Sequence, residues 1–423
     1  MKIDLEELVH AGILNQPTAE AIHQYYLSKK GDEQSSRLTY IISIAGVVLV
    51  SLGLILIIGY NWDQIPKLIK LIVAFIPLFI GYALGVYTLL KRPNENLWNE
   101  ISAVAILFGI GIAMALISQI YNIESQLSDF LKWWLILSIP LIYIFKAGFC
   151  SLLIWGGITW FLTAKTGKIN LPHTLWSLLF ILSGSIPYFL EIRKPKLQLA
   201  WSWHHWLIPF VLIIFTFSLA PYSCNRMTVI HFLGLFFIFN WFRNLDILKE
   251  KLWVQAYYVY AFIGIWVLAF VYSFKGFWSS VDHGFGDCFN GSGLVISLTF
   301  MGLFLLALID SFRKKSLQFS DLLDFKWMIF LLILLTVLGS EALNLSRLAA
   351  NILILTGSGL TIYRGIKEEK LGKLNLGLVI LAIWIICRFF ETDISFVWRG
   401  VIFIALGILC FYLNSSLLKR KKS

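Results

Sequence analysis

From Leu38 to the C-terminus, the chain alternates between long apolar runs and short polar stretches. About 20 consecutive apolar residues are needed to cross a bilayer as a helix. The pattern therefore predicts an all-α fold, a polytopic transmembrane helix bundle of about fourteen spans, with twelve as the alternative. The candidate spans centre on 38–60, 68–90, 101–121, 131–145, 147–164, 173–190, 205–220, 228–242, 253–274, 291–312, 327–340, 347–363, 373–390 and 395–418.

Some candidate spans are short for a full crossing. The segments 131–145, 147–164, 228–242 and 327–340 are short enough to be re-entrant or half-spanning helices instead of full spans, which would lower the count to twelve or thirteen. Losing a single span would reverse the sidedness of every loop that follows it. An even number of spans is therefore favoured over thirteen.

The polar segment 1–37 precedes the apolar runs and lacks the features of a cleaved signal peptide. Its apolar spacing predicts a helical hairpin in which Gly12 ends the first helix and Pro17 begins the second. Such a hairpin needs a surface for its apolar face. We expect 1–37 to lie in the cytoplasm or on the membrane surface and to be a candidate docking segment for a protein partner, 38–418 to form the bundle, and 419–423 to be a basic cytoplasmic tail.

The composition excludes a water-soluble fold. Of the 423 residues, 58% are hydrophobic and only 14% are charged, against about 25% charged in ordinary soluble domains. The mean hydropathy is +0.78. We expect the lipid bilayer as partner and no nucleic acid, because no basic stripe lies on a domain long enough to dock a duplex.

The net charge of +11 follows from the distribution of basic residues between alternate loops. With fourteen spans and a cytoplasmic N-terminus, 25 of the 35 Lys and Arg residues fall on the inner side. This is the bias by which membrane proteins are oriented. Both termini are therefore predicted to be cytoplasmic, and the basicity needs no polyanionic partner.

Motifs at both ends of the chain point to a known family. Asn61, Trp62 and Asp63 stand in the stretch Tyr60–Pro66 after the first apolar run, and Gln119, Tyr121 and Asn122 close the third span. Together with the N-terminal hairpin and the closing stretches Leu374–Gly377 and Arg388–Glu391, these motifs resemble a bacterial multi-pass membrane-protein family catalogued as domain of unknown function 2157. The resemblance implies an inner-membrane protein of no established activity, so it provides no catalytic residue.

Ionisable residues at the membrane edge are the best candidates for a functional site, because a charge in hydrocarbon is costly. Three predicted outer turns carry both signs of charge. They contribute seven residues to a candidate outward-facing polar vestibule: Asp63, Glu341, Arg347, Arg388, Glu391, Asp393 and Arg399. The alternative is that each turn holds only helix-end ion pairs that snorkel to the interface.

Other polar positions are expected to have structural roles. We expect Gln119, Tyr121 and Asn122 to bond between helices, since Gly109 and Gly111 allow close packing there. The adjacent pair His204–His205 lies among tryptophans typical of an interfacial belt, and the loop 274–291 is expected to be an exposed connection. The sequence does not decide whether Cys224 and Cys288 form a disulfide. No metal or cofactor is predicted.

The sequence contains no P-loop, GxSxG elbow, HExxH or Asp-rich pair. Enzymes that rely on those motifs are disfavoured, so the protein is not expected to be an enzyme. The favoured interpretation is an inner-membrane protein of transport or envelope-assembly type. A non-catalytic scaffold or accessory subunit is the first alternative, and a membrane-embedded lipid-modifying transferase with a dispersed site is the second.

Overall fold

The computed structural model describes residues 15–20, 65–164, 171–191, 204–219, 225–243, 255–281, 292–313, 325–338, 343–391 and 395–422. This part of the chain is all-helical and contains no strand. The chain divides into two compact units, Met1–Ala74 and Phe75–Ser423. Each is described by itself below.

In the first unit, the structure describes the start of the second helix predicted near the N-terminus. Residues 16–20 are helical, and the side-chain oxygen of Asn15 accepts a hydrogen bond from the backbone N–H of Thr18 at 3.1 Å. A side-chain oxygen at this position caps the free N–H groups of a first helical turn. The rest of the hairpin and the candidate span 38–60 lie outside the described residues.

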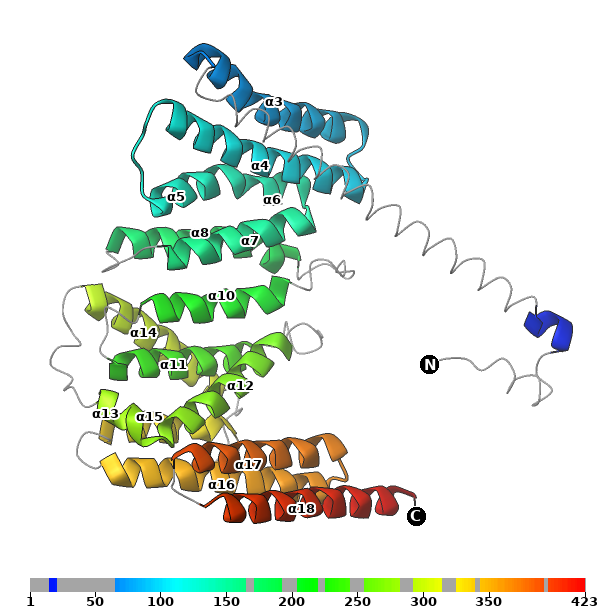
Figure 1. Ribbon diagram of the computed structural model, residues 1–423, viewed down its shortest axis with the longest axis vertical. Helices are drawn as coiled ribbons and strands as arrows, with labels where there is room; N and C mark the ends of the chain where they lie inside the picture. The colour runs from blue at the N-terminus through cyan, green and yellow to red at the C-terminus, as the bar shows by residue number, and fades with distance from the viewer. Residues whose placement is uncertain are drawn as a thin grey trace. The chain divides into compact units, whose positions relative to one another are not determined.

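The apolar runs from Lys67 onward form the helices that the sequence predicts (Figure 1). Their bounds are α3 (Lys67–Lys91), α4 (Asn96–Ile120), α5 (Leu127–Ser138), α6 (Pro140–Phe145), α7 (Gly148–Thr163), α8 (Leu171–Glu191), α10 (His204–Ser218), α11 (Asn225–Arg243), α12 (Gln255–Tyr272), α13 (Lys275–Val281), α14 (Ser292–Arg313), α15 (Phe325–Leu338), α16 (Leu343–Lys367), α17 (Leu371–Glu391) and α18 (Phe396–Lys422).

Seven stretches among the described residues are helical, apolar and long enough to cross a membrane. They are Lys67–Lys91, Asn96–Ile120, Leu127–Phe145, Pro172–Leu190, Gln255–Tyr272, Asn344–Lys367 and Leu371–Phe389. The prediction that 131–145 is short is wrong, because its helical stretch begins at Leu127 and has 19 residues. Pro140, which has no N–H to donate, separates it into α5 and α6.

Four further apolar helices are shorter. Gly148–Thr163, Met227–Phe242 and Trp327–Leu338 match three of the segments predicted to be short, and His204–Ser218 is the fourth. These helices have 10–17 residues in their apolar part, so each needs a thinned bilayer or polar flanking residues to span it.

Glycines allow the helices of the second unit to approach closely, as predicted for Gly109 and Gly111. A Cβ atom on Gly109 in α4 would lie 2.8 Å from Leu78 Cα in α3, and one on Gly111 would lie 3.2 Å from the Trp134 Nε1 atom. Gly377 in α17 packs in the same way, because its Cβ would lie 2.8 Å from the backbone nitrogen of Ile362 in α16. Small residues at helix contacts are typical of membrane bundles.

A carboxylate from another helix caps the N-terminus of α7. The side chain of Glu100 in α4 accepts hydrogen bonds from the backbone N–H groups of Phe149 (3.0 and 3.1 Å) and Cys150 (3.2 Å). The N-cap residue itself, Ala147, has no side chain able to do so. Glu100 therefore satisfies donors that would otherwise be left unpaired at the start of a helix.

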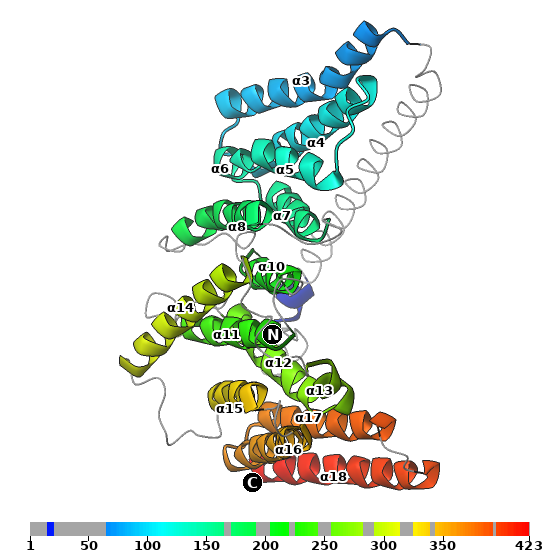
Figure 2. The ribbon, with the colours of Figure 1, turned by 90° about the vertical axis from the view of Figure 1, so that its left-hand side faces the viewer.

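The C-terminal helices pack against one another and against α12. α17 lies beside both α16 and α18, and α12 packs on α16 and on the short helix α13 (Figures 1 and 2). As a result, the C-terminal end of α12, the N-terminal end of α16 and the C-terminal end of α17 meet. This meeting point holds the candidate site.

Candidate functional site

The site is built on the turn that joins α12 to α13. Ser273 is fully buried there, and its backbone N–H closes the last turn of α12 on the carbonyls of Ala269 (3.2 Å) and Phe270 (3.0 Å). Its hydroxyl donates to the Phe270 carbonyl at 2.6 Å. The Ser273 carbonyl then points away from α12 and is available to other helices.

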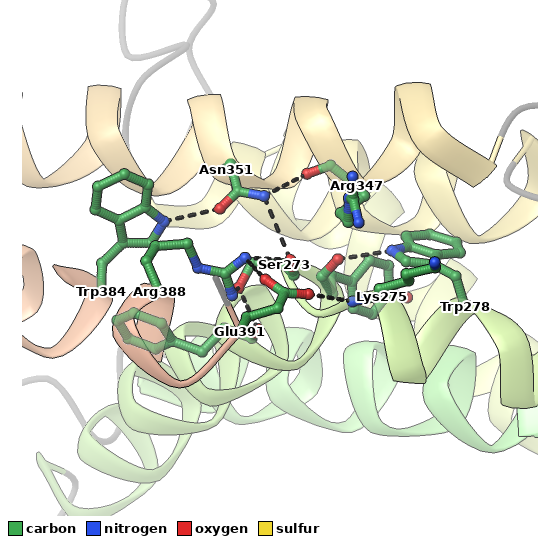
Figure 3. Close-up of polar contacts among 10 residues, drawn as sticks. Ser273, Lys275, Trp278, Arg347, Asn351, Trp384, Arg388 and Glu391 are labelled. Carbon is green, nitrogen blue, oxygen red and sulfur yellow. Dashed lines mark hydrogen bonds and ion pairs between the residues drawn. The ribbon is translucent and has the colours of Figure 1, made fainter. Parts of the chain in front are cut away.

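Arg388, in the last turn of α17, bonds to that carbonyl (Figure 3). Its guanidinium donates to the Ser273 carbonyl at 3.0 Å and to the Ser273 hydroxyl oxygen at 2.9 Å. The guanidinium carbon also lies 4.7 Å from the centre of the Phe274 ring. Planar guanidinium groups suit this combination of forked hydrogen bonding and ring contact.

Glu391 completes the contact between α17 and the α12–α13 turn. It forms an ion pair with Arg388, one helical turn earlier, and its other oxygen accepts a hydrogen bond from the backbone N–H of Lys275 at 2.7 Å. Only 14% of the Arg388 side chain and 19% of the Glu391 side chain are exposed. The two charges neutralise each other in a partly buried position.

Asn351 connects α16 to the same point (Figure 3). Its amide nitrogen donates to the Ser273 carbonyl at 3.3 Å and to the Arg347 carbonyl at 2.8 Å, and its amide oxygen accepts a hydrogen bond from the Trp384 indole at 2.9 Å. We call Ser273, Asn351, Trp384, Arg388 and Glu391 the outer-end cluster, after the side of the membrane that the sequence predicts for these helix ends. Its members come from α16, α17 and the turn between α12 and α13, and their polar atoms bond mainly to one another.

The structure brings together only part of the predicted vestibule. Arg388 and Glu391 are paired as the sequence indicates. Arg347 takes part through its main-chain carbonyl, and Arg399 is half-buried in the first turn of α18. The other three predicted residues, Asp63, Glu341 and Asp393, lie outside the described residues.

Sequence reasoning missed Ser273, Asn351 and Trp384. Asn351 could have been predicted from the sequence, because it is a polar side chain within the apolar run Leu348–Thr356. Ser273 could not, since a serine at the end of a helix is common. Its role depends on which helices are neighbours.

The expectation for the Gln119 motif is wrong. Gln119, Tyr121 and Asn122 are exposed, and in the described part of the chain their side chains form no hydrogen bond to another helix. Instead they form the turn that ends α4. Asn122 has the left-handed φ of 51°, and the Ser118 hydroxyl donates to the Ile123 carbonyl at 2.9 Å. Asparagine tolerates this conformation better than most residues.

The two adjacent histidines are buried between helices and do not face the interface. His204 stacks on Tyr188 with ring centres 4.1 Å apart, and His205 lies edge-on to Phe189 and 3.4 Å from the Tyr257 hydroxyl. Trp206 remains on the surface, while Trp201, Trp203, Cys224 and Cys288 lie outside the described residues. The expectation that 274–291 is an exposed connection is wrong for 275–281, which form α13 with a buried Trp278, and 282–291 lie outside the described residues. Among the described residues, no group of three or more His, Cys, Asp or Glu side chains is arranged to hold a metal ion.

The comparison with known families concerns the N-terminal part of the chain. Residues 6–151 match the model of a family described as a predicted membrane protein (DUF2157). The match confirms the resemblance seen in the N-terminal motifs, and the closing stretches Leu374–Gly377 and Arg388–Glu391 lie outside it. It ends in the first turn of α7, so it includes Glu100 and the donors that Glu100 caps, whereas the outer-end cluster lies beyond it. No curated protein and no solved structure matches the chain.

The family match and the apolar helices together identify an integral membrane protein in contact with the lipid bilayer. The surface of the described helices agrees, because many large side chains such as Phe79, Leu182 and Leu306 are more than half exposed. In water such a surface would drive aggregation, whereas hydrocarbon solvates it.

Proposed function

We propose that the chain is a fourteen-span protein of the bacterial inner membrane, with both termini cytoplasmic, that works in transport or envelope assembly. In this proposal the outer-end cluster is a closed gate on the outward-facing side. The observation that carries it is the pair Arg388–Glu391, which holds α17 on the α12–α13 turn through atoms of Ser273 and Lys275.

The contacts between helices support the alternating topology. The contact of Glu100 with Phe149 and that of Trp241 with Asp310 (2.7 Å) join helix ends that the alternation of basic loops assigns to the inner side. The hydroxyl contact of Tyr272 with Thr336 and the whole outer-end cluster join ends assigned to the outer side. In each of these contacts, both helix ends are assigned to the same side of the membrane.

The chemistry of the cluster favours a gate over a fixed structural contact. A partly buried ion pair stabilises a fold weakly compared with apolar side chains of similar size, because both charges lose water. Its bonds exchange readily when water enters, so it suits a contact that opens and closes. The cluster bonds the α12–α13 turn to α17, while α16 and α17 stay packed through Gly377.

Residues 1–37 are proposed as a peripheral docking segment for a protein partner. Support comes from its described residues, since 16–20 are helical and the Asn15 side chain accepts a hydrogen bond from the Thr18 N–H. Their deletion should leave membrane insertion intact, because insertion depends on apolar length and flanking charge. Loss of insertion would mean that the segment belongs to the packed bundle.

The test compares two matched ion pairs. Right-side-out membrane vesicles that hold wild-type protein, Arg388→Gln or Arg92→Gln are loaded with a cell metabolite extract, and solute release is followed by mass spectrometry. Arg92 pairs with Glu95 at the same i,i+3 spacing but is exposed. The proposal expects at least one solute to cross faster than in vesicles without the protein, with a rate altered by Arg388→Gln only. No such solute, together with a stoichiometric protein partner on purification, would favour the scaffold.

A further inference from the structure

A second feature of the described helices is a cleft of about 410 Å³ where α14 and α15 both pack against α11. This volume is within the range of roughly 300–1,000 Å³ typical of small-molecule sites. The described residues that line it include no Lys, Arg, Asp or Glu. His231 and Ser297 supply its polar side-chain atoms, and the remaining lining is apolar.

The polar pair is buried at the wall of the cleft. His231 is 3% exposed and Ser297 is 6% exposed, and the His231 Nε2 atom lies 3.1 Å from the Ser297 hydroxyl oxygen. The imidazole also stacks on Phe300, with ring centres 4.9 Å apart. Its second nitrogen, Nδ1, is buried and has no hydrogen-bond partner among the described residues. A buried polar atom without a partner is costly, so it marks a place where a ligand atom would be stabilised.

The cleft opens toward the lipid-facing surface. Leu298 and Met301, both on α14, line it and are 51% and 52% exposed. A side opening between spans admits molecules from the hydrocarbon region of the bilayer. An apolar chain would therefore enter without crossing water.

The depth of the polar pair matches the ester region of a lipid. His231 is the seventh residue of α11 and Ser297 the sixth of α14. With a rise of 1.5 Å per residue, both lie about 8–9 Å from the helix ends. The alternation of basic loops assigns those ends to the outer side. The hydrocarbon core is about 30 Å thick within a bilayer of about 40–45 Å, so ester groups lie several ångströms below the surface.

We propose that this cleft binds one acyl chain of a phospholipid from the outward-facing leaflet, with its ester carbonyl at His231 Nδ1. In the matching tautomer the Ser297 hydroxyl donates to Nε2, and the Nδ1–H group donates to the carbonyl oxygen. The chain then runs past Gly234 toward Phe304 and Ile333. The uncharged lining fits an acyl ester and disfavours a charged ligand. This site is independent of the proposed gate, since none of its residues belongs to the outer-end cluster.

Gly234 offers a direct way to block the cleft. A Cβ on Gly234 meets no atom within 4 Å, so the side chain of Gly234→Leu enters open space in the cleft. Gly302 on α14 is equally unobstructed and does not line the cleft, so Gly302→Leu is the matched control.

The experiment uses full-length protein in nanodiscs with phosphatidylglycerol that carries a diazirine in one acyl chain. After irradiation, labelled peptides are mapped by mass spectrometry. The proposal expects labelling concentrated on residues 227–234 and 297–304, reduced at least fivefold by Gly234→Leu and unchanged by Gly302→Leu. His231→Phe, which keeps the stacking ring, should lower lipid retention. Labelling spread evenly over all lipid-facing helices, or equal in wild type and Gly234→Leu, would overturn it.

If Gly234→Leu fails to fold, a competition experiment on the wild-type protein tests the proposal. Labelling of the two segments is measured with increasing amounts of unlabelled phosphatidylglycerol at constant probe concentration. The unlabelled lipid competes for a saturable site, so labelling of the two segments should fall more steeply than that of other lipid-facing segments, which sample the constant amount of probe. A loss of labelling equal to that of other lipid-facing segments would contradict a specific site.

Discussion

The Arg388 guanidinium donates hydrogen bonds to both the carbonyl and the hydroxyl oxygen of Ser273, a residue 115 positions earlier in the chain. The contact joins α17 to the end of α12, two helices that chain order does not make neighbours. The same carbonyl also accepts a hydrogen bond from Asn351. One main-chain atom thus connects three helices.

Removing the charge of Arg388 should destabilise the protein far more than removing that of Arg92. Arg388→Gln leaves Glu391 partly buried without its cation and removes one of the two side-chain hydrogen bonds to the Ser273 carbonyl, and we expect a loss of roughly 2–3 kcal/mol. The exposed pair Arg92–Glu95 should be worth about 0–1 kcal/mol. Unfolding by SDS titration in mixed micelles measures both. Equally small losses of unfolding free energy in the two variants would show that Arg388–Glu391 is only an interfacial ion pair.

Exchanging the two charges should not rescue that loss. In Arg388→Glu with Glu391→Arg, a carboxylate would face the Ser273 carbonyl and a guanidinium would face the Lys275 N–H. Both contacts are then mismatched, although the pair itself is preserved. A double variant as stable as wild type would show that only the mutual attraction of the charges matters.

The capping of α7 by Glu100 predicts a second stability effect. Glu100→Ala leaves the Phe149 and Cys150 N–H groups without their acceptor, and capping losses are about 0.5–2 kcal/mol. Glu95→Ala, in the loop before α4 and exposed, is the control for loss of a carboxylate. If both variants unfold at the same SDS fraction, the carboxylate does not stabilise α7.

The close approach of α3 and α4 predicts opposite effects for two glycines. Gly109→Ala places its Cβ 2.8 Å from Leu78 Cα, so the helices must separate, at a cost of about 1–3 kcal/mol. Gly156→Ala meets no atom within 4 Å and should be neutral or stabilise by up to about 1 kcal/mol, because alanine favours helix. Both are measured as changes in unfolding free energy. A neutral Gly109→Ala would contradict the packing.

The sequence predicted the helices well and the site only in part. The thirteen candidate spans from 68–90 onward all coincide with described helices, because apolar run length alone determines where a chain can be helical in lipid. Arg388 and Glu391 were found since charges at a membrane edge are unusual. Their acceptors were missed because Ser273 becomes an acceptor only through the packing of α12 beside α16 and α17.

The turn between α16 and α17 predicts a pH dependence. Hydrogen bonds from Lys373 (2.6 Å) and the nearby Lys370 (3.1 Å) lower the pKa of Glu368 from its usual value of 4.5. A lowered pKa means that the ion pairs stabilise the fold above about pH 4.5 and that this contribution is lost as the pH falls through the folded pKa. The difference in melting temperature between wild type and Glu368→Gln should therefore be present at pH 7 and shrink below pH 4.5. A difference that grows on acidification would contradict this sign.

The most direct test of the account is the distance between the α12–α13 turn and the end of α17. In a variant without the native cysteines, Lys275→Cys and Glu391→Cys are treated in membranes with a bis-methanethiosulfonate reagent of two-carbon spacer. Because the Lys275 N–H lies 2.7 Å from the Glu391 carboxylate, we predict efficient crosslinking within one chain, detected by mass spectrometry. Lys275→Cys with Arg364→Cys, at the opposite end of α16, should not crosslink. No link between positions 275 and 391 in folded protein would contradict the outer-end cluster.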